Sequence, residues 1–127
     1  MSLVDHLVVL APSLAEGVAW CEATLGVVPG PGGEHPLMGT HNRLIPITTP
    51  AFPRAYLEII AIHREAVPQR AAGAKRWFDL DNEALQARLR AHGPQLAHWV
   101  AEVPDLPRAL AALGAQGLDR GRVVAAS

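Results

Sequence analysis

Two histidines occupy the same place in a repeated pattern of this chain, and they are the first candidates for chemistry. The segment that begins at His6 reads HLVVLAPSL, and the segment that begins at His98, 92 residues later, reads HWVAEVPDL. The two agree in His, Val, Pro and Leu at positions one, three, seven and nine, which indicates an internal duplication. Imidazole nitrogens bind metal ions and transfer protons. A histidine placed alike in two copies can converge with its counterpart on one site.

Glu58 is the third candidate, because it is the one charge in an otherwise apolar stretch of seven residues. A carboxylate in such a strand is costly unless it is paired, solvated in a cavity or bound to a cation. Period-two alternation places His6 on one strand face and Leu7 and Val9 on the other, and the aliphatic face suits the helix that follows. By the same logic Glu58 points away from the helix, so His6 and Glu58 are predicted to face one pocket. The alternative is a hydrogen-bonded core histidine and a glutamate on an open sheet face.

A polar segment around residue 41 offers further candidates for binding a substrate. His41 alternates with Thr40 and Asn42, so either His41 or the Thr40/Asn42 pair faces the pocket, but not both. The hydroxyl and the amide are suited to hydrogen bonds with substrate oxygens, and a structural turn is the alternative. His35 precedes Pro36, which favours an extended conformation, and we expect it in a loop near the pocket mouth.

The elements that must position these residues follow a β-α-β-β-β order over residues 1–62. Alternating or continuous apolar runs predict strands, and Ser13 and Gly26 predict the start and stop of a helix. The Gly- and Pro-rich segment 27–39 allows only a short strand, around Val27 and Val28 or around residues 34–35. The expected elements are a strand over 3–10, a helix over 14–25, this short strand, and strands over 40–48 and 55–62.

The remaining residues divide into a connection over 63–95 and a second copy over 96–127. The connection carries a helix over 82–91, capped by Asp81 or Asn82, and its adjacent Trp77 and Phe78 are expected to pack on the domain, with ligand stacking as the alternative. The second copy has a strand over 96–103, a cap at Asp105, a helix over 106–115 and a further strand beginning at 122–125.

We therefore expect a single domain over 1–127 whose second module is incomplete. The first module uses about 60 residues, whereas the second has 32. Either the sequence is a fragment of a longer chain, or a partner chain supplies the missing strands. Unpaired strand edges invite association, so we expect a homodimer.

Composition excludes several classes of partner. The chain has 127 residues, 50% of them hydrophobic, and a net charge of −1 with no run of like charge, which argues against nucleic acid or an acidic membrane surface as a partner. No apolar run approaches the length of a membrane span. The single cysteine, Cys21, cannot form an internal disulfide, and no signal peptide precedes Leu3, so we expect a cytoplasmic protein.

These motifs together resemble the vicinal oxygen chelate superfamily, which includes glyoxalase I, extradiol dioxygenases and bleomycin-resistance proteins. The likeness lies in Asp-His-Leu-Val-Val at 5–9, the Pro-Ser-Leu that follows, Tyr-Leu-Glu-Ile-Ile at 56–60, and the repeat at His98. More narrowly, Gly-Glu-His-Pro at 33–36 and Gly-Thr-His-Asn-Arg-Leu at 39–44 are similar to the glyoxalase-like domain family. The resemblance spans about residues 3–118 and implies an α+β fold of paired βαβββ modules.

The resemblance also implies a divalent metal in a cleft between the modules. Its ligands come from the first and fourth strands, which correspond here to His6, Glu58 and His98. The fourth would fall near position 150, past the end of this sequence. Imidazoles and a carboxylate suit Zn, Ni, Fe or Mn, and Glu58 would serve as ligand or as catalytic base. The expected function is a metal-dependent lyase, isomerase or dioxygenase acting on a small oxygenated substrate; the alternatives are a non-catalytic, metal-free small-molecule-binding protein and an inactive fragment.

Overall fold

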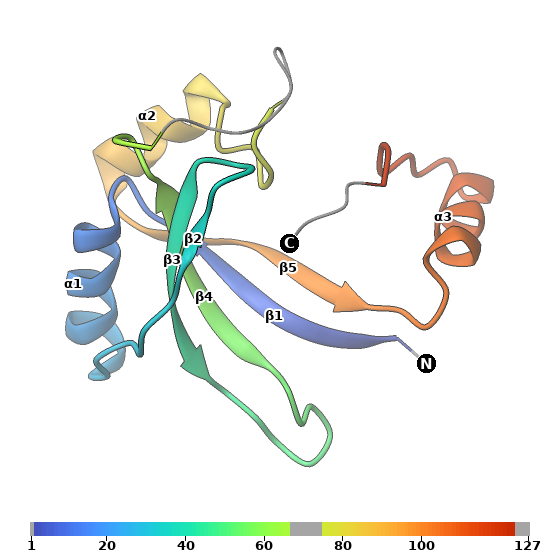
Figure 1. Cartoon of the computed structure of the whole chain (residues 1–127), viewed down its shortest axis with the longest axis horizontal. Coiled ribbons are helices and arrows are strands. Elements are labelled where there is room, and N and C mark those ends of the chain that lie inside the picture. The colour runs from blue at the N-terminus through green and yellow to red at the C-terminus, as the bar shows by residue number, and fades with distance from the viewer. Residues whose placement is uncertain (1, 67–74, 124–127) are drawn as a thin grey trace.

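The computed structural model describes residues 2–66 and 75–123, and every structural statement below concerns these residues. They form one five-stranded mixed sheet with three helices, as expected for an α+β fold (Figure 1). The strands are β1 (Leu3–Leu10), β2 (Glu34–His35), β3 (Thr40–Pro46), β4 (Tyr56–Ile62) and β5 (Gln95–Glu102), and the helices are α1 (Leu14–Leu25), α2 (Glu83–His92) and α3 (Leu106–Ala115).

The strand order β2-β3-β4-β1-β5 places the two copies of the repeat side by side. β1 pairs in parallel with β4 and antiparallel with β5, while β3 pairs antiparallel with β2 and β4. The predicted β-α-β-β-β order of the first 62 residues is confirmed, with the short strand at residues 34–35. β5, which begins the second copy, is an edge strand among the described residues.

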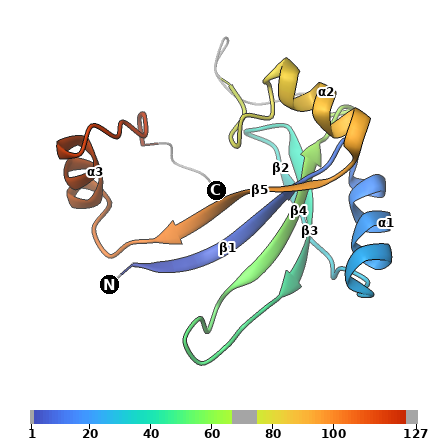
Figure 2. The same cartoon turned by 180° about the vertical axis from the view of Figure 1, so that it is seen from behind.

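Two helices cover opposite faces of the sheet. α1 packs on the face that carries Val9 and Ile59, where Cys21 is fully buried. The other face carries Val8 and Leu10, and its far end is covered by Leu80 and by α2 (Figure 2). Because each fully buried aliphatic side chain contributes about 1.5–3 kcal/mol, these two clusters hold the layers together. On the face that carries Val8 and Leu10, the region around His6 is lined by polar side chains instead.

Local signals set the helix boundaries. Ser13 caps α1 by accepting a hydrogen bond from the Glu16 amide at 3.1 Å, and Gly26 ends it in the left-handed conformation, with φ 68°. α2 begins after Asn82, whose side chain accepts from the Leu85 amide at 2.9 Å. The sequence left Asp81 or Asn82 open as the cap; Asp81 instead accepts hydrogen bonds from the backbone and side chain of Arg76.

Some boundaries differ from expectation. β3 ends at Pro46, two residues earlier than predicted, before the connection to β4. Arg122 and Val123 are not in a strand, and the other residues of the strand expected over 122–125 lie outside the described part of the chain. α3 has the predicted bounds but no buried residue. In Figure 1 it stands apart from the sheet, beyond the end of β5.

The pairing of β1 with β5 has a local two-fold symmetry that matches the repeat. Leu7 pairs with Trp99, which is its own counterpart 92 residues later. On one side of this pair His6 pairs with Val100, and on the other side Val8 pairs with His98. Val8 and Val100 are themselves counterparts in the repeat, so the two pairs are equivalent. A local two-fold axis through the Leu7–Trp99 pair therefore relates His6 to His98 across the β1–β5 pair.

None of the described helices is both long enough and apolar enough to span a membrane.

Candidate functional site

The structure brings His6 and Glu58 together on one face of the sheet. The parallel register pairs His6 with Tyr56 and Val8 with Glu58, so the two side chains project from neighbouring strands toward each other. His6 Nε2 lies 3.4 Å from Glu58 Oε1. Only 9% of His6 and 5% of Glu58 is exposed. The shared face predicted from alternation is therefore the one observed.

Asp5 and Tyr56 fix the orientation of the His6 ring. The Nδ1–H of His6 donates to Asp5 Oδ2 at 2.7 Å, and the Tyr56 ring stacks on the imidazole with centroids 4.4 Å apart. Nε2 is thereby directed at Glu58. Burial lowers the pKa of His6 and is the largest single influence, but the two carboxylates together outweigh it, so the pKa lies above its ordinary value. Burial, with Glu58 and Asp5 adding to it, raises the pKa of Tyr56 to about 12, which keeps the phenol neutral.

Asn42 holds the other oxygen of Glu58. Its Nδ2 donates to Glu58 Oε2 at 2.6 Å and approaches His35 Nε2 at 3.2 Å, while its Oδ1 accepts from the Gly33 amide at 2.8 Å. The Gly33 N–H fixes the orientation of the amide, because only the oxygen can accept from it. Both amide hydrogens are then used, one by Glu58 and one by His35.

The same bonds fix the state of His35. Since its Nε2 accepts from Asn42, its proton lies on Nδ1 and is donated to Thr40 Oγ1 at 2.8 Å. Burial lowers the pKa of His35, with Glu58 opposing, which agrees with a neutral ring. A hydrogen-bonded chain thus runs from Thr40 through His35 and Asn42 to Glu58.

The Gly- and Pro-rich segment that precedes β2 lies against β3 and holds these hydrogen-bonded side chains in place. Gly33 pairs with Asn42 through the backbone, and Arg43 donates to the carbonyls of Pro29 and Gly30 at 2.7 and 2.9 Å. A Cβ on Gly32 would collide with the backbone oxygen of Asn42, so the close approach requires glycine. Gly32 therefore serves the site by letting this segment lie close to β3.

Thr40 and Asn42, and not His41, face Glu58. His41 lies on the other face, where its ring stacks on His63 with centroids 4.3 Å apart. Burial, followed by the neighbouring His63, lowers the pKa of His41. Of the two alternatives that the sequence left open, the structure places the Thr40/Asn42 pair at the site.

His98 lies on the same sheet face as His6 but does not join the pair. It is directly opposite Val8, which separates it from Glu58 across the sheet. Its Nε2 lies 3.8 Å from Asp79 Oδ2, and its ring is 5.5 Å from that of Phe78. Within residues 2–66 and 75–123, no three His, Cys, Asp or Glu side chains converge closely enough to hold a metal ion.

The His6–Glu58 pair nevertheless has the spacing of two metal ligands. Two donors that each lie about 2.1 Å from a tetrahedral or octahedral cation are separated by about 3.0–3.4 Å. The observed 3.4 Å fits this range and exceeds a charge-assisted hydrogen bond of about 2.7–2.9 Å. The Asp5 carboxylate behind Nδ1 is the arrangement that commonly supports a metal-bound histidine. The residues present fit a cation as a pair, and the third candidate ligand, His98, lies on the same face.

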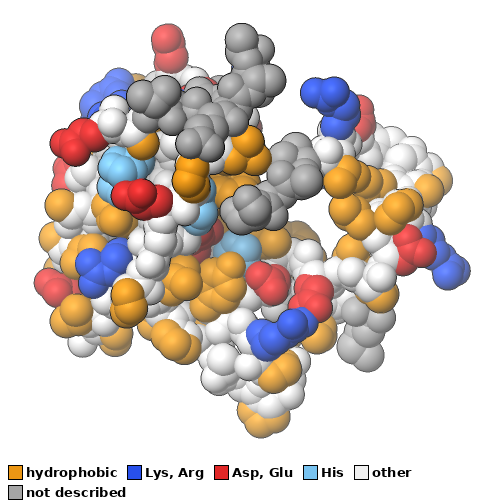
Figure 3. Space-filling view, viewed as in Figure 1, with side chains coloured by type: hydrophobic (Ala, Val, Ile, Leu, Met, Phe, Trp, Pro, Cys, Tyr) orange, Lys and Arg blue, Asp and Glu red, His pale blue; other side chains and the backbone are white. Residues whose placement is uncertain are grey.

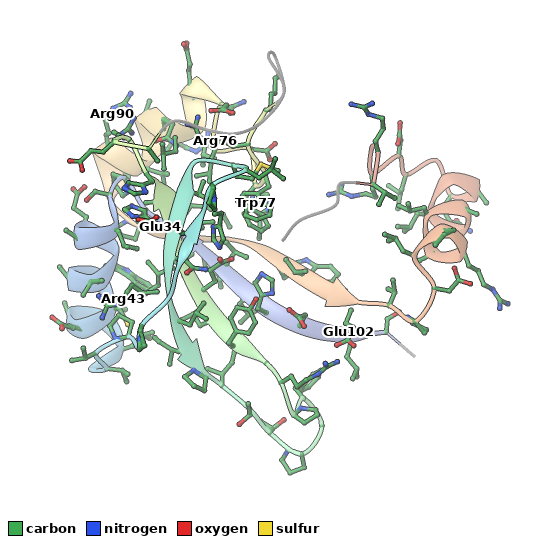
Figure 4. All side chains as sticks on the ribbon, viewed as in Figure 1. Glu34, Arg43, Arg76, Trp77, Arg90 and Glu102 are labelled. Atoms are coloured by element: carbon green, nitrogen blue, oxygen red, sulfur yellow. The ribbon has the colours of Figure 1, made fainter. Side chains whose placement is uncertain are left out.

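Aromatic side chains surround this polar centre. Trp77, labelled in Figure 4, projects from the connection, and its ring meets His35 edge-on at 5.2 Å. Figure 3 shows histidine and acidic side chains in the hollow between the body of the sheet and α3, with hydrophobic side chains around them. Sequence reasoning missed Asp5, Tyr56 and the role of His35. The first two could have been found, since Asp5 precedes His6 and Tyr56 shares the face of Glu58.

Comparisons with known proteins agree with this architecture. The model of the glyoxalase-like domain family matches residues 4–127. No curated protein matches the chain.

Several solved structures are similar to the chain. Methylmalonyl-CoA epimerase from Mycobacterium tuberculosis shares 18% identity at a TM-score of 0.54, over 90% of this chain and 63% of that one. A methylmalonyl-CoA epimerase in complex with methylmalonyl-CoA and NH4+ shares 17% identity at a TM-score of 0.59, over 92% of this chain and 71% of the other. A hypothetical protein from Bacillus halodurans C-125 shares 11% identity at a TM-score of 0.57, over 91% of this chain and 69% of the other. At these identities the likeness concerns the fold, and the chain spans under two thirds of the Mycobacterium protein.

Proposed function

Because the chain belongs to the glyoxalase-like domain family, we propose that it is a metal-dependent isomerase or lyase that moves a proton at a carbon next to a carbonyl group. The observation that carries the proposal is the buried His6–Glu58 contact of 3.4 Å, backed by Asp5. The similar structures include epimerases bound to acyl-CoA molecules, which supports a small carbonyl compound as the substrate class.

The residues divide into those that bind and those that position. His6, Glu58 and His98 would hold a divalent cation, which when bound would polarise the carbonyl and stabilise the anion formed by proton removal. Glu58 uses Oε1 either as a ligand of that cation or, when it is not bound to it, as the base that takes up and returns the proton, because Oε2 is held by Asn42. Both amide hydrogens of Asn42 are already used, so we propose that it positions Glu58 rather than binding the substrate directly.

Metal content tests the proposal most directly. Protein purified without chelator should carry close to one divalent cation per binding site by elemental mass spectrometry, and His6→Ala should lose it while circular dichroism shows an intact fold. His92→Ala, at an exposed histidine at the end of α2, is the matched control and should keep the metal. An unchanged metal content in His6→Ala would contradict the assignment.

The aromatic surroundings favour one alternative function. Aromatic rings lie against the histidines of the site: Tyr56 against His6, Trp77 against His35 and Phe78 against His98. The site can therefore also bind a hydrophobic molecule without catalysing a reaction. A purified protein that is metal-free yet binds such a molecule, with Tyr56→Ala weakening the binding, would support this non-catalytic function instead.

We also propose that the working protein is a homodimer located in the cytoplasm. Leu96 and Trp99 on the edge strand β5 are 62% and 66% exposed, and Leu106 and Leu113 of α3 are exposed as well. An apolar edge of this kind favours association. The free, buried Cys21 supports a reducing compartment.

A further inference from the structure

A pocket separate from the site around His6 lies between the end of β4 and one face of α2. Its volume is about 680 Å³, which is in the range of small-molecule sites. The residues of α2 that line it recur at helical spacing and share one face of the helix, whereas Leu85 and Leu89 pack against the sheet. These lining residues are Glu83, Gln86, Ala87 and Arg90. The pocket shares no lining residue with the candidate metal site.

Three arginines give this pocket a positive character, and two of them, Arg76 and Arg90, are labelled beside α2 in Figure 4. Arg76 is held by Asp81, which accepts hydrogen bonds from its Nη1 and from its backbone amide, both at 2.6 Å. Arg64 and Arg90 are exposed and make no hydrogen bond or ion pair within the described part of the chain. The guanidinium groups outnumber the two lining carboxylates, Asp81 and Glu83, and the first of these is already paired with Arg76.

Two buried polar atoms in the wall of the pocket lack a hydrogen-bond partner. They are Arg76 Nε, a donor, and Gln86 Oε1, an acceptor. Gln86 is only 8% exposed, and its Nε2 donates to the Leu80 carbonyl at 2.8 Å, which leaves its oxygen as the unpaired end of the amide. Because buried polar atoms are almost always paired, a donor and an acceptor left unpaired beside one pocket indicate a partner that the protein does not supply. Neither atom is exposed in this structure, so the two side chains must turn toward an occupant to bond with it.

We propose that this pocket binds a small phosphorylated molecule that carries a hydroxyl group close to its phosphate. Guanidinium groups match the oxygens of a phosphate in pairs, and its three terminal oxygens can accept from Arg64, Arg76 and Arg90 together. A hydroxyl group supplies the donor that Gln86 Oε1 lacks. The site is independent of the proposed function, because the bound molecule contacts none of the residues assigned to the metal or to proton transfer.

The test is titration calorimetry of the full chain with glycerol 3-phosphate, which has both groups, and with inorganic phosphate. We expect glycerol 3-phosphate to bind at least about tenfold more tightly than phosphate. Arg90→Ala should raise the dissociation constants of both compounds at least about tenfold. Arg88→Ala is the matched control, since Arg88 is exposed on the same helix but does not line the pocket, and it should leave both constants unchanged.

Two further variants separate the phosphate from the hydroxyl group. Gln86→Met should remove the preference for glycerol 3-phosphate while phosphate binding is kept, and a preference that persists would overturn the role of the hydroxyl group. Gln86 is buried and Met could impair folding, so Arg64→Ala, at an exposed side chain outside the helices and strands, serves as the second variant and should weaken binding of both compounds.

Three results would overturn the inference: wild-type protein that binds neither compound, equal affinities in Arg90→Ala and Arg88→Ala, or tighter binding of glycerate, which carries a carboxylate in place of the phosphate. The metal content of Arg90→Ala should equal that of the wild type. The inference and the proposed function can therefore fail separately.

Discussion

Asn42 is the residue on which the geometry of Glu58 depends. Its side chain makes three contacts, to Glu58, Gly33 and His35, and it is 8% exposed. Removing it leaves an oxygen of the buried Glu58 carboxylate and an imidazole nitrogen of the half-buried His35 without partners, whereas water can replace it at the N–H of the exposed Gly33. A buried polar group left unsatisfied costs about 1–3 kcal/mol.

Asn42→Ala should therefore lower the free energy of unfolding by about 2–3 kcal/mol, as measured by urea denaturation followed by circular dichroism. Asn82→Ala, which removes the cap of α2 and its one bond to the Leu85 amide, should cost only about 1 kcal/mol and is the comparison. Equal losses in the two variants would show that the Asn42 network contributes no more than a single cap.

Prediction of single residues from the sequence succeeded where the alternation within a strand was enough to determine which face a side chain occupies. Alternation placed His6 and Glu58 on one face because period two is a local property. It could not place His98 relative to them, because that depends on the register in which β5 pairs with β1, which sets His98 opposite Val8 and is a long-range property. His35 was missed for the same reason, since its bonds come from Thr40 and Asn42 on the next strand.

At the scale of elements, Gly17 determines how closely α1 can lie on the sheet. A Cβ at this position would be 2.5 Å from Ile59 Cγ2 and 3.0 Å from Ala11 Cβ, so the glycine is required by packing and not by its backbone freedom. Because α1 packs on the strand that carries Glu58, displacing the helix would also disturb the site. The spacing of polar and apolar residues predicted the bounds of α1 but gave no sign of this contact.

Gly17→Ala should lower the free energy of unfolding by about 1–2 kcal/mol, because the overlap outweighs the gain of up to about 1 kcal/mol that alanine brings to a helix. Gly114→Ala is the matched control, since nothing lies within 4 Å of its added Cβ in α3. It should raise stability in the same thermal or urea measurement. A stabilised Gly17→Ala would mean that α1 shifts on the sheet without loss.

On the scale of the whole molecule, the second copy of the repeat is formed locally but remains unfinished in its packing. The capped helix α3 and the strand β5 appear where the sequence predicted them, because caps and apolar runs act over a few residues. What covers them is a long-range property that no local pattern contains. Leu96 pairs with Val9 and Trp99 with Leu7, so both lie on the α1 side of the sheet, where α1 itself packs mainly on β3 and β4.

We predict that the protein forms a homodimer that buries the exposed apolar side chains of β5, Leu96 and Trp99. Sedimentation velocity over a range of concentrations should show a reversible dimer, and Trp99→Lys should shift it to monomer, because a charge would be buried at the centre of the apolar strip. Val28→Lys, at a side chain that is 68% exposed on another part of the surface, should leave the dimer intact. A strict monomer at high concentration would contradict association through β5. A dimer that persists in Trp99→Lys would place the contact on a different surface and leave the apolar face of β5 open to solvent.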